Sequence, residues 1–346
     1  MNRGDLKKIL SWFSLFTLVF VAVILILLFN GYISYDKSEE LHTCGDGTFY
    51  EDCSLNKPLF CDKGILVEDS LKCGCKDDFF KKDNSCVNSF YNDEEKRAFK
   101  YVLDGEEKEV EISVYEEINN YVKKLPRSKF YSEGEIPKRI DFKLLKIEDD
   151  IQKQAIQELI YKIQNLAPED KDTQARIAIS LVQNIPYSET SEENKFNEDD
   201  SIKFARFPYQ VLYDNQGSCE GKSELLVLIL RELGYGTSFF YYSLENHEAV
   251  GIKCPVKESL FGSGFCFVET TSPSILGDYG GIYLGTGKLV SNPEIVLVND
   301  GLSLSKNLKE YKDSKKLMNI REGKSLSVLF KSGIFERFNQ RYGLNL

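Results

Sequence analysis

An unbroken apolar stretch near the start of the chain constrains its organisation most. Residues 9–29 read ILSWFSLFTLVFVAVILILLF and contain no charged side chain. A helix of this length rises 1.5 Å per residue and spans the roughly 30 Å hydrocarbon core of a bilayer. A cleaved signal peptide has a shorter apolar region, of about 7 to 15 residues, and a small-x-small cleavage site, and neither is evident before Asn30. We therefore predict a transmembrane signal anchor over residues 9–31; a buried core helix is the alternative.

The charges on either side of this stretch predict its orientation. Basic residues gather within residues 1–8, whereas acidic residues gather within residues 35–40. Under the positive-inside rule, residues 1–8 lie in the cytoplasm and the rest of the chain lies outside the cell. The sequence thus predicts a single-pass protein of the cell membrane with an extracytoplasmic domain.

The composition of the whole chain is that of a folded protein. Hydrophobic residues make up 42% and charged residues 28% of the 346 positions, which is enough for a sizeable core. The net charge is -10, and the lysines and arginines are spread along the chain. A nucleic-acid-binding surface needs clustered positive charge, so no nucleic-acid partner is expected.

Most of the nine cysteines fall in one short stretch, residues 42–90, which has little apolar content. This pattern predicts a small module held by three disulfides, whose 15 possible connectivities the sequence leaves open. A zinc site and a redox pair at Cys73-Gly-Cys75 are the alternatives. The six cysteines are Cys44, Cys53, Cys61, Cys73, Cys75 and Cys86.

The remaining cysteines divide into a pair and a single thiol. Cys254 and Cys266 flank a glycine-containing loop between two apolar runs, where a disulfide can join facing strand ends. If these two are paired and the module is fully oxidised, Cys219 alone stays free. An unpaired thiol outside the cell calls for a functional reason.

The pattern along the rest of the chain predicts an α+β fold. Residues 97–146 contain a hairpin around Asp104-Gly105 and a short helix, and belong either to a small domain or to an extension of the next one. Helices are expected over residues 147–166, 173–183, 208–213 and 219–233, and a charged loop over 188–200. Strands are expected over residues 237–242, 247–253 and 264–269, near 283, and over 293–298. Residues 301–346 are expected to be mainly helical.

Three residues of the segment 147–300 form a candidate catalytic set. Cys219 lies in a Gly-Ser-Cys-Glu-Gly sequence at the start of an apolar helix, and a helix N-terminus stabilises a thiolate. His247 begins one predicted strand, and Glu269 ends the next. If the two strands are antiparallel neighbours and the helix packs on their sheet, a base and an orienting acid meet the thiol. A buried inert thiol, a core histidine and a strand-end glutamate are the alternatives.

The segments that carry these residues are GSCEGKSELLVLILRELG, ENHEAVGI and VETTSP. Their order and spacing resemble the transglutaminase-like superfamily of papain-like cysteine enzymes over residues 147–298. The resemblance implies an antiparallel sheet with the cysteine-bearing helix packed on it. It also implies Cys219 as nucleophile, His247 as general base and acid, Glu269 as orienting carboxylate, and Gln183 as a candidate oxyanion donor. A solvated helix-end glutamine is the alternative for Gln183.

The sequence departs from the family pattern at one of these positions. The family usually places Asp in an Asp-Pro-Thr strand end, whereas this chain has Glu269-Thr270-Thr271. Glu is one methylene longer, so its carboxylate reaches His247 only if the backbone lies further back. The prediction is a thiol hydrolase or acyltransferase that acts on peptide or carboxamide bonds of a cell-surface substrate, without metal or cofactor. An inactive protein-binding module on the same fold is the alternative.

Overall fold

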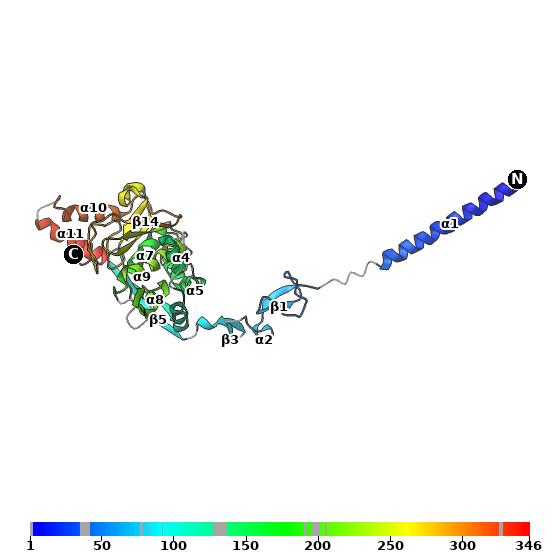
Figure 1. Cartoon of the computed structure of the whole chain (residues 1–346), viewed down its shortest axis with the longest axis horizontal. Helices are drawn as coiled ribbons and strands as arrows, with labels where there is room; N and C mark the ends of the chain where they lie inside the picture. The colour runs from blue at the N-terminus through cyan, green and yellow to red at the C-terminus, as the bar shows by residue number, and fades with distance from the viewer. Residues whose placement is uncertain are drawn as a thin grey trace. The chain divides into compact units, whose positions relative to one another are not determined.

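The computed structural model describes residues 3–34, 42–76, 79–82, 84–91, 93–126, 137–189, 192–195, 201–204, 206–324 and 328–346. The chain divides into two compact units, Met1–Ser89 and Phe90–Leu346 (Figure 1). The strand pair after the cysteine module, whose domain the sequence leaves open, belongs to the second unit together with the candidate catalytic residues.

The first unit begins with the apolar helix α1 (Arg3–Ser34). Residues Ser11–Phe29 of this helix are long and apolar enough to cross a membrane. All their side chains are exposed, which excludes the alternative of a buried core helix. The acidic residues used above to predict the orientation of α1 lie outside the described part of the chain.

The cysteine-rich stretch contains the predicted disulfides. They join Cys44 to Cys61, Cys53 to Cys73, and Cys75 to Cys86. The zinc site and the Cys73–Cys75 redox pair are therefore excluded, because each of these sulfurs is bonded to a different cysteine. Its described residues form helix α2 (Ser70–Cys73) and two antiparallel pairs, β1 (Leu59–Asp62) with β2 (Ile65–Glu68) and β3 (Phe79–Lys82) with β4 (Ser85–Asn88).

The second unit contains the predicted helices, with one of them divided. The apolar run over residues 147–166 forms the end of one helix and two further helices. Asp149 caps the first of these two by accepting a hydrogen bond from the amide of Gln152. The helices are α3 (Glu116–Lys123), α4 (Arg139–Ile147), α5 (Asp150–Ala155), α6 (Gln157–Leu166), α7 (Lys171–Asn184), α8 (Pro208–Asp214), α9 (Cys219–Glu232), α10 (Lys309–Arg321) and α11 (Val328–Tyr342).

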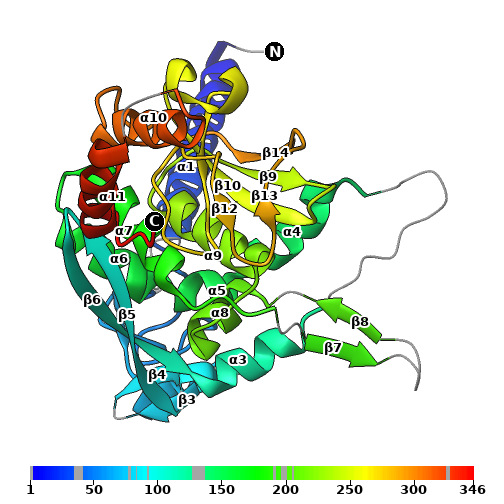
Figure 2. The ribbon, with the colours of Figure 1, turned by 90° about the vertical axis from the view of Figure 1, so that its left-hand side faces the viewer.

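A four-stranded antiparallel sheet lies at the centre of this unit (Figure 2). Its strands, in spatial order, are β11 (Phe265–Val268), β10 (His247–Lys253), β9 (Thr237–Tyr242) and β14 (Glu294–Asn299). A disulfide between Cys254 and Cys266 joins β11 to the end of β10, as predicted. Helices before an antiparallel sheet confirm the predicted α+β class.

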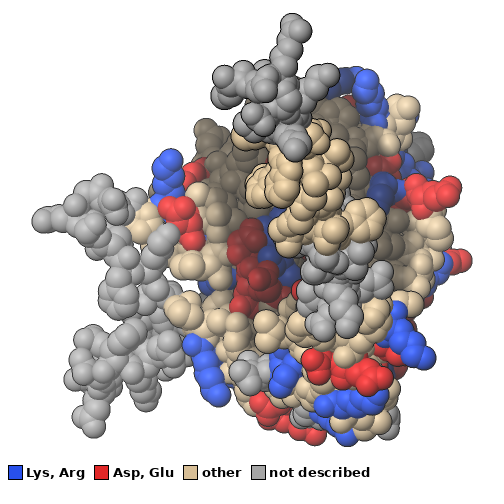
Figure 3. Space-filling view, turned by 90° about the vertical axis from the view of Figure 1, so that its right-hand side faces the viewer, with Lys and Arg blue, Asp and Glu red and all other residues tan. Residues whose placement is uncertain are grey.

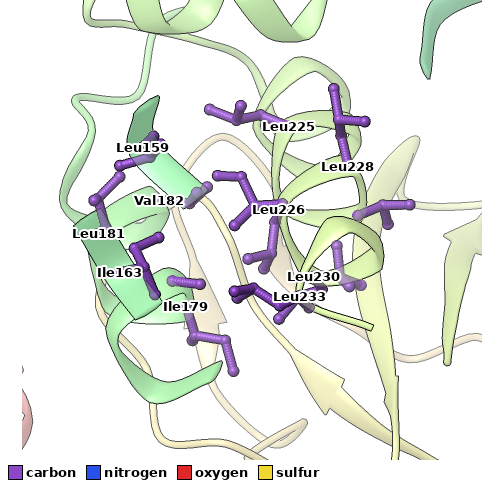
Figure 4. Packing of buried hydrophobic residues seen from close by; sticks show 14 of the residues in the cluster. Leu159, Ile163, Ile179, Leu181, Val182, Leu225, Leu226, Leu228, Leu230 and Leu233 are labelled. Atoms are coloured by element: carbon purple, nitrogen blue, oxygen red, sulfur yellow. The ribbon is translucent and has the colours of Figure 1, made fainter. Parts of the chain in front are cut away.

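Helix α9 is enclosed on all sides. Its residues Leu225 to Leu230 are completely buried, as expected for a helix that is apolar all round. One side packs against β9 and β10, and other sides contact α4, α7 and α8. Figure 4 shows its leucines meeting apolar side chains of α6 and α7. This packing fixes the position of α9, whose first residue is Cys219.

The long hairpin of β5 (Glu94–Leu103) and β6 (Glu106–Tyr115) packs on the helices of the same unit (Figure 2). Its strand β5 contacts α7, where the Ser180 hydroxyl accepts a hydrogen bond from the Val102 amide. The charged loop expected over residues 188–200 instead includes β7 (Glu192–Lys195), which pairs with β8 (Ser201–Phe204). The alternating Ser-Ile-Lys-Phe sequence of β8 is typical of a strand.

Candidate active site

A cleft of about 810 Å³ opens on the second unit. Cys219 and His247 both line it, together with residues of α4, the β9–β10 turn and the hairpin β12 (Ile282–Tyr283) and β13 (Gly287–Lys288). Figure 3 shows acidic side chains gathered in a hollow of the molecular surface. The structure thus places the predicted nucleophile and base in one cleft.

Cys219 is the free cysteine of the chain, and it is half-buried. It is the first residue of α9, and the hydroxyl of Ser218 caps this helix by accepting a hydrogen bond from the Gly221 amide at 3.4 Å. Close packing favours glycine at 221, since a Cβ there would lie 3.0 Å from the Arg206 carbonyl oxygen. The first turn therefore presents the thiol at the positive end of the helix.

Strand alternation brings His247 and Glu269 to the same face of the sheet. Successive side chains of a strand point to opposite faces. Ala249 and Phe267 belong to the apolar cluster on the face away from α9, and His247 and Glu269 share their parity. The Nε2 atom of His247 lies 3.0 Å from Oε2 of Glu269, and both side chains are completely buried.

The extra methylene of Glu269 fits the register of the strands. Val250 pairs with Val268, so continuing this register places Glu269 opposite Ala249, two residues from His247. A diagonal neighbour of this kind needs a longer reach than a directly opposed pair. The other carboxylate oxygen, Oε1, accepts hydrogen bonds from the amides of Thr270 and Thr271 and from the Thr271 hydroxyl, at 3.0, 2.8 and 2.7 Å. Glutamate at position 269, in place of the usual aspartate, therefore still contacts the imidazole of His247.

His247 and Glu269 each stabilise the charged form of the other. Burial lowers the pKa of His247, but hydrogen bonds to Cys219 and Glu269 outweigh it and raise that pKa to about 10. Burial raises the pKa of Glu269, whereas its hydrogen bonds to His247 and Thr271 bring it below the ordinary value. His247 is thus an imidazolium at neutral pH, beside a carboxylate.

The strand expected near residue 283 is β12, and its hairpin with β13 completes the surroundings of the imidazole. The Thr286 hydroxyl lies 3.0 Å from Nδ1 of His247. The ring of Tyr283 is stacked on the imidazole, with centroids 6.0 Å apart and an interplanar angle of 2°. Gly285 has a φ of +72°, and a Cβ there would lie 2.1 Å from the Tyr187 hydroxyl oxygen, so only glycine fits.

The first turn of α9 is tethered by buried polar side chains. The buried Lys222 donates hydrogen bonds to the carbonyl oxygens of Ile185, Gln183 and Thr271, at 2.5, 3.3 and 3.4 Å. Ser223 lies 3.1 Å from both the Glu248 carbonyl and the Thr270 hydroxyl. These contacts join the start of α9 to the segment that follows Glu269.

A buried charge network adjoins the same turn. Nζ of Lys143, on α4, lies 2.8 to 3.0 Å from carboxylate oxygens of Glu220, Glu224 and Glu248. Lys146 adds contacts to Glu220 and Glu224 at 3.1 and 3.2 Å. Burial, opposed by Lys143, raises the pKa of Glu248 to about 7. The network fixes the α4 wall of the cleft to α9 and β10.

Gln183, the candidate oxyanion donor, lies away from the cleft. Its amide nitrogen donates hydrogen bonds to the carbonyl oxygens of Glu269 and Ser274, at 2.9 and 3.1 Å. A side-chain amide has two N–H donors, so both are used. Gln183 lies outside the set of described residues that line the cleft. The structure therefore does not bring it to the thiol as an oxyanion donor; it holds the strand end that carries Glu269.

Comparison of the chain with protein-family models, with curated protein sequences and with solved structures finds no match.

Proposed function

We propose that the chain is a thiol enzyme with a transglutaminase-like core that acts on amide bonds. The observation that carries this proposal is the arrangement of its free cysteine. Cys219 begins a helix in a cleft that His247 also lines, and its hydrogen bond to the imidazole helps to raise the pKa of a ring whose Nε2 atom contacts the buried carboxylate of Glu269. A nucleophile, a base and an orienting acid are the groups that acyl transfer through a covalent intermediate requires.

The proposed reaction proceeds in two steps. The thiolate of Cys219 attacks the carbonyl carbon of a peptide or carboxamide, and the backbone N–H at the start of α9 stabilises the oxyanion. The His247 imidazolium then gives its Nδ1 proton to the leaving amine, which leaves a thioester. Water, or a second amine, gives a proton back to Nδ1 as it attacks the thioester, and the C–S bond then breaks to release the carboxylic acid or the new amide from Cys219. The thiol enzyme is thereby restored without any change of oxidation state.

We infer that α1 anchors this enzyme in the cell membrane with its N-terminus in the cytoplasm. Its apolar span is exposed, and basic residues precede it. The four disulfides support an oxidising, extracytoplasmic location for both units.

Alkylation of Cys219 tests the proposal. The other eight cysteines are disulfide-bonded, so iodoacetamide uptake by the full chain in detergent reports this thiol alone. An isolated thiol is only a few per cent thiolate at pH 7, so we expect His247→Ala to slow alkylation about 30-fold at pH 7 and little at pH 9. Slow labelling of the wild type, unchanged in His247→Ala, would instead support an inactive binding module.

The charges of the cleft predict the preferred substrate. Among the described residues that line it are five glutamates and, besides His247, three basic residues: Glu189, Glu220, Glu224, Glu245, Glu248, Arg139, Lys143 and Lys146. A cleft with excess negative charge attracts cations and focuses its field on the substrate. We expect acyl donors flanked by lysine to react about 10-fold faster at low salt than matched donors flanked by glutamate, and this ratio to shrink at high salt. Equal kcat/KM for both donors at low salt would contradict this preference.

A further inference from the structure

The imidazole of His247 makes a second polar contact, which the proposed triad does not include. Its Nε2 atom is engaged by Glu269, so Nδ1 is the nitrogen left to exchange protons with the thiol and with the leaving amine. The hydroxyl of Thr286 lies 3.0 Å from that same Nδ1 atom. Thr286 is half-buried and lines the cleft beside Cys219.

The hairpin that carries Thr286 is built around the imidazole. In this hairpin, Tyr283 pairs with Gly287, and the ring of Tyr283 is stacked on the imidazole. The Tyr283 hydroxyl is itself fixed, because it donates to the Asp278 carbonyl at 2.8 Å and accepts from the Gly281 amide at 3.1 Å. The hairpin thus holds one face and one edge of the ring, while Glu269 holds the opposite edge.

A hydroxyl suits this place for a specific chemical reason. During the proposed cycle Nδ1 alternates between an N–H donor, in the imidazolium, and a bare acceptor, in the neutral ring. A hydroxyl can accept in the first state and donate in the second, since it has one proton and two lone pairs. A carboxylate or an ammonium would favour only one of the two states. Thr286 therefore satisfies Nδ1 whichever protonation state the ring has.

We propose that Thr286 is a positioning residue that keeps the Nδ1 edge of His247 aligned through both protonation states. This inference rests on the proposed function, because it assigns a role in the same proton transfers. Thr286 acts through His247 and forms no bond with the substrate. Two residues of the hairpin, Tyr283 and Thr286, accordingly belong to the active site, although they are far from Cys219 in the sequence.

The test compares Thr286→Val, which keeps the shape and removes the hydroxyl, with Thr286→Ser, which keeps the hydroxyl. Loss of one hydrogen bond of ordinary strength predicts a 5- to 10-fold slower release of p-nitrophenol from p-nitrophenyl acetate in the first acylation turnover for Thr286→Val. We expect Thr286→Ser to stay within about twofold of the wild type. Leu284→Ala, in the exposed turn of the same hairpin, is the control for hairpin integrity and should leave the rate unchanged.

A spectroscopic readout separates this inference from the proposed function. The chain has only two histidines, so ¹⁵N spectra of histidine-labelled full chain resolve His247. We expect Thr286→Val to move its Nδ1 resonance and Thr286→Ser to leave it near the wild-type position. Unmoved Nδ1 resonances together with wild-type acylation in Thr286→Val would overturn the inference. An unreactive wild-type thiol would refute the proposed function, whereas the Nδ1 shift would still test the contact.

Discussion

Replacing Lys143 with methionine is expected to destabilise the second unit by about 3 to 5 kcal/mol at pH 8. Lys143 is almost completely buried and contacts three glutamates, of which Glu224 and Glu248 are also buried. Removing the cation leaves Glu248 without its lysine and Glu224 with Lys146 alone in a dry environment, and an uncompensated buried charge is among the most costly single changes in a protein. Chemical unfolding of the full chain in detergent measures the difference.

The loss of stability in Lys143→Met should depend on pH in a defined direction. In the folded protein, burial raises the pKa of Glu248 to about 7, above the ordinary 4.5 of the unfolded chain. A raised pKa of this kind adds stability that is fully present below about pH 4.5 and is lost as the pH rises through 7. Without Lys143 that pKa rises further, so the difference between variant and wild type should be small at pH 5 and largest at pH 8.

The matched control is Lys100→Met. Lys100 forms an ion pair with Glu107 at 2.7 Å, but both side chains are more than half exposed. Exposed pairs of this kind contribute little, so we expect a change of less than about 0.5 kcal/mol at either pH. Similar losses for the two lysine variants, or a larger loss for Lys143→Met at pH 5 than at pH 8, would contradict the role given to the buried network.

Replacing Glu269 with glutamine is expected to slow acylation of Cys219 about 10²- to 10⁴-fold. Oε1 of Glu269 accepts three hydrogen bonds from Thr270 and Thr271, so the oxygen of glutamine must occupy that side. Its NH₂ group then faces Nε2 of His247 and donates to it. The neutral ring must carry its proton on Nδ1, where it cannot accept the thiol proton.

Two measurements check this result. ¹⁵N spectra of histidine-labelled protein report the tautomer of His247 directly, and the release of p-nitrophenol from p-nitrophenyl acetate reports the acylation rate. Glu158→Gln is the control, since Glu158 also accepts a backbone amide hydrogen bond and pairs with a cation, but on α6. An unchanged tautomer, or acylation within a few-fold of the wild type, would remove Glu269 from the proposed catalytic set.

The sequence predicted local structure better than the contacts of the candidate site. Strands β9 and β10 begin and end at the predicted residues, because aromatic and β-branched runs are bounded by a polar turn. The division of residues 147–166 into separate helices was missed. The apolar spacing there is continuous, whereas the cap at Asp149 depends on one side-chain hydrogen bond.

The residues around His247 show why the contacts of the candidate site could not be predicted from the sequence. Alternation along a strand places His247 and Glu269 on one face once the pairing of their strands is assumed. Thr286 gives no such signal, because it follows a two-residue strand and approaches the imidazole only in the folded chain. Lys143 meets its three glutamates from a helix far upstream of them, so no local pattern encodes the network.

The arrangement of the cysteines has a consequence for the biosynthesis of the protein. A free thiol can exchange with disulfides, so Cys219 could attack the bridges of its own chain during folding. The six cysteines of the first unit precede it in the chain and emerge before it during synthesis. Cys254 and Cys266 emerge after it but close a short loop of sequence separation 12, which favours their mutual encounter. The order of the chain thus protects the disulfides from the thiol that the proposed enzyme must keep reduced.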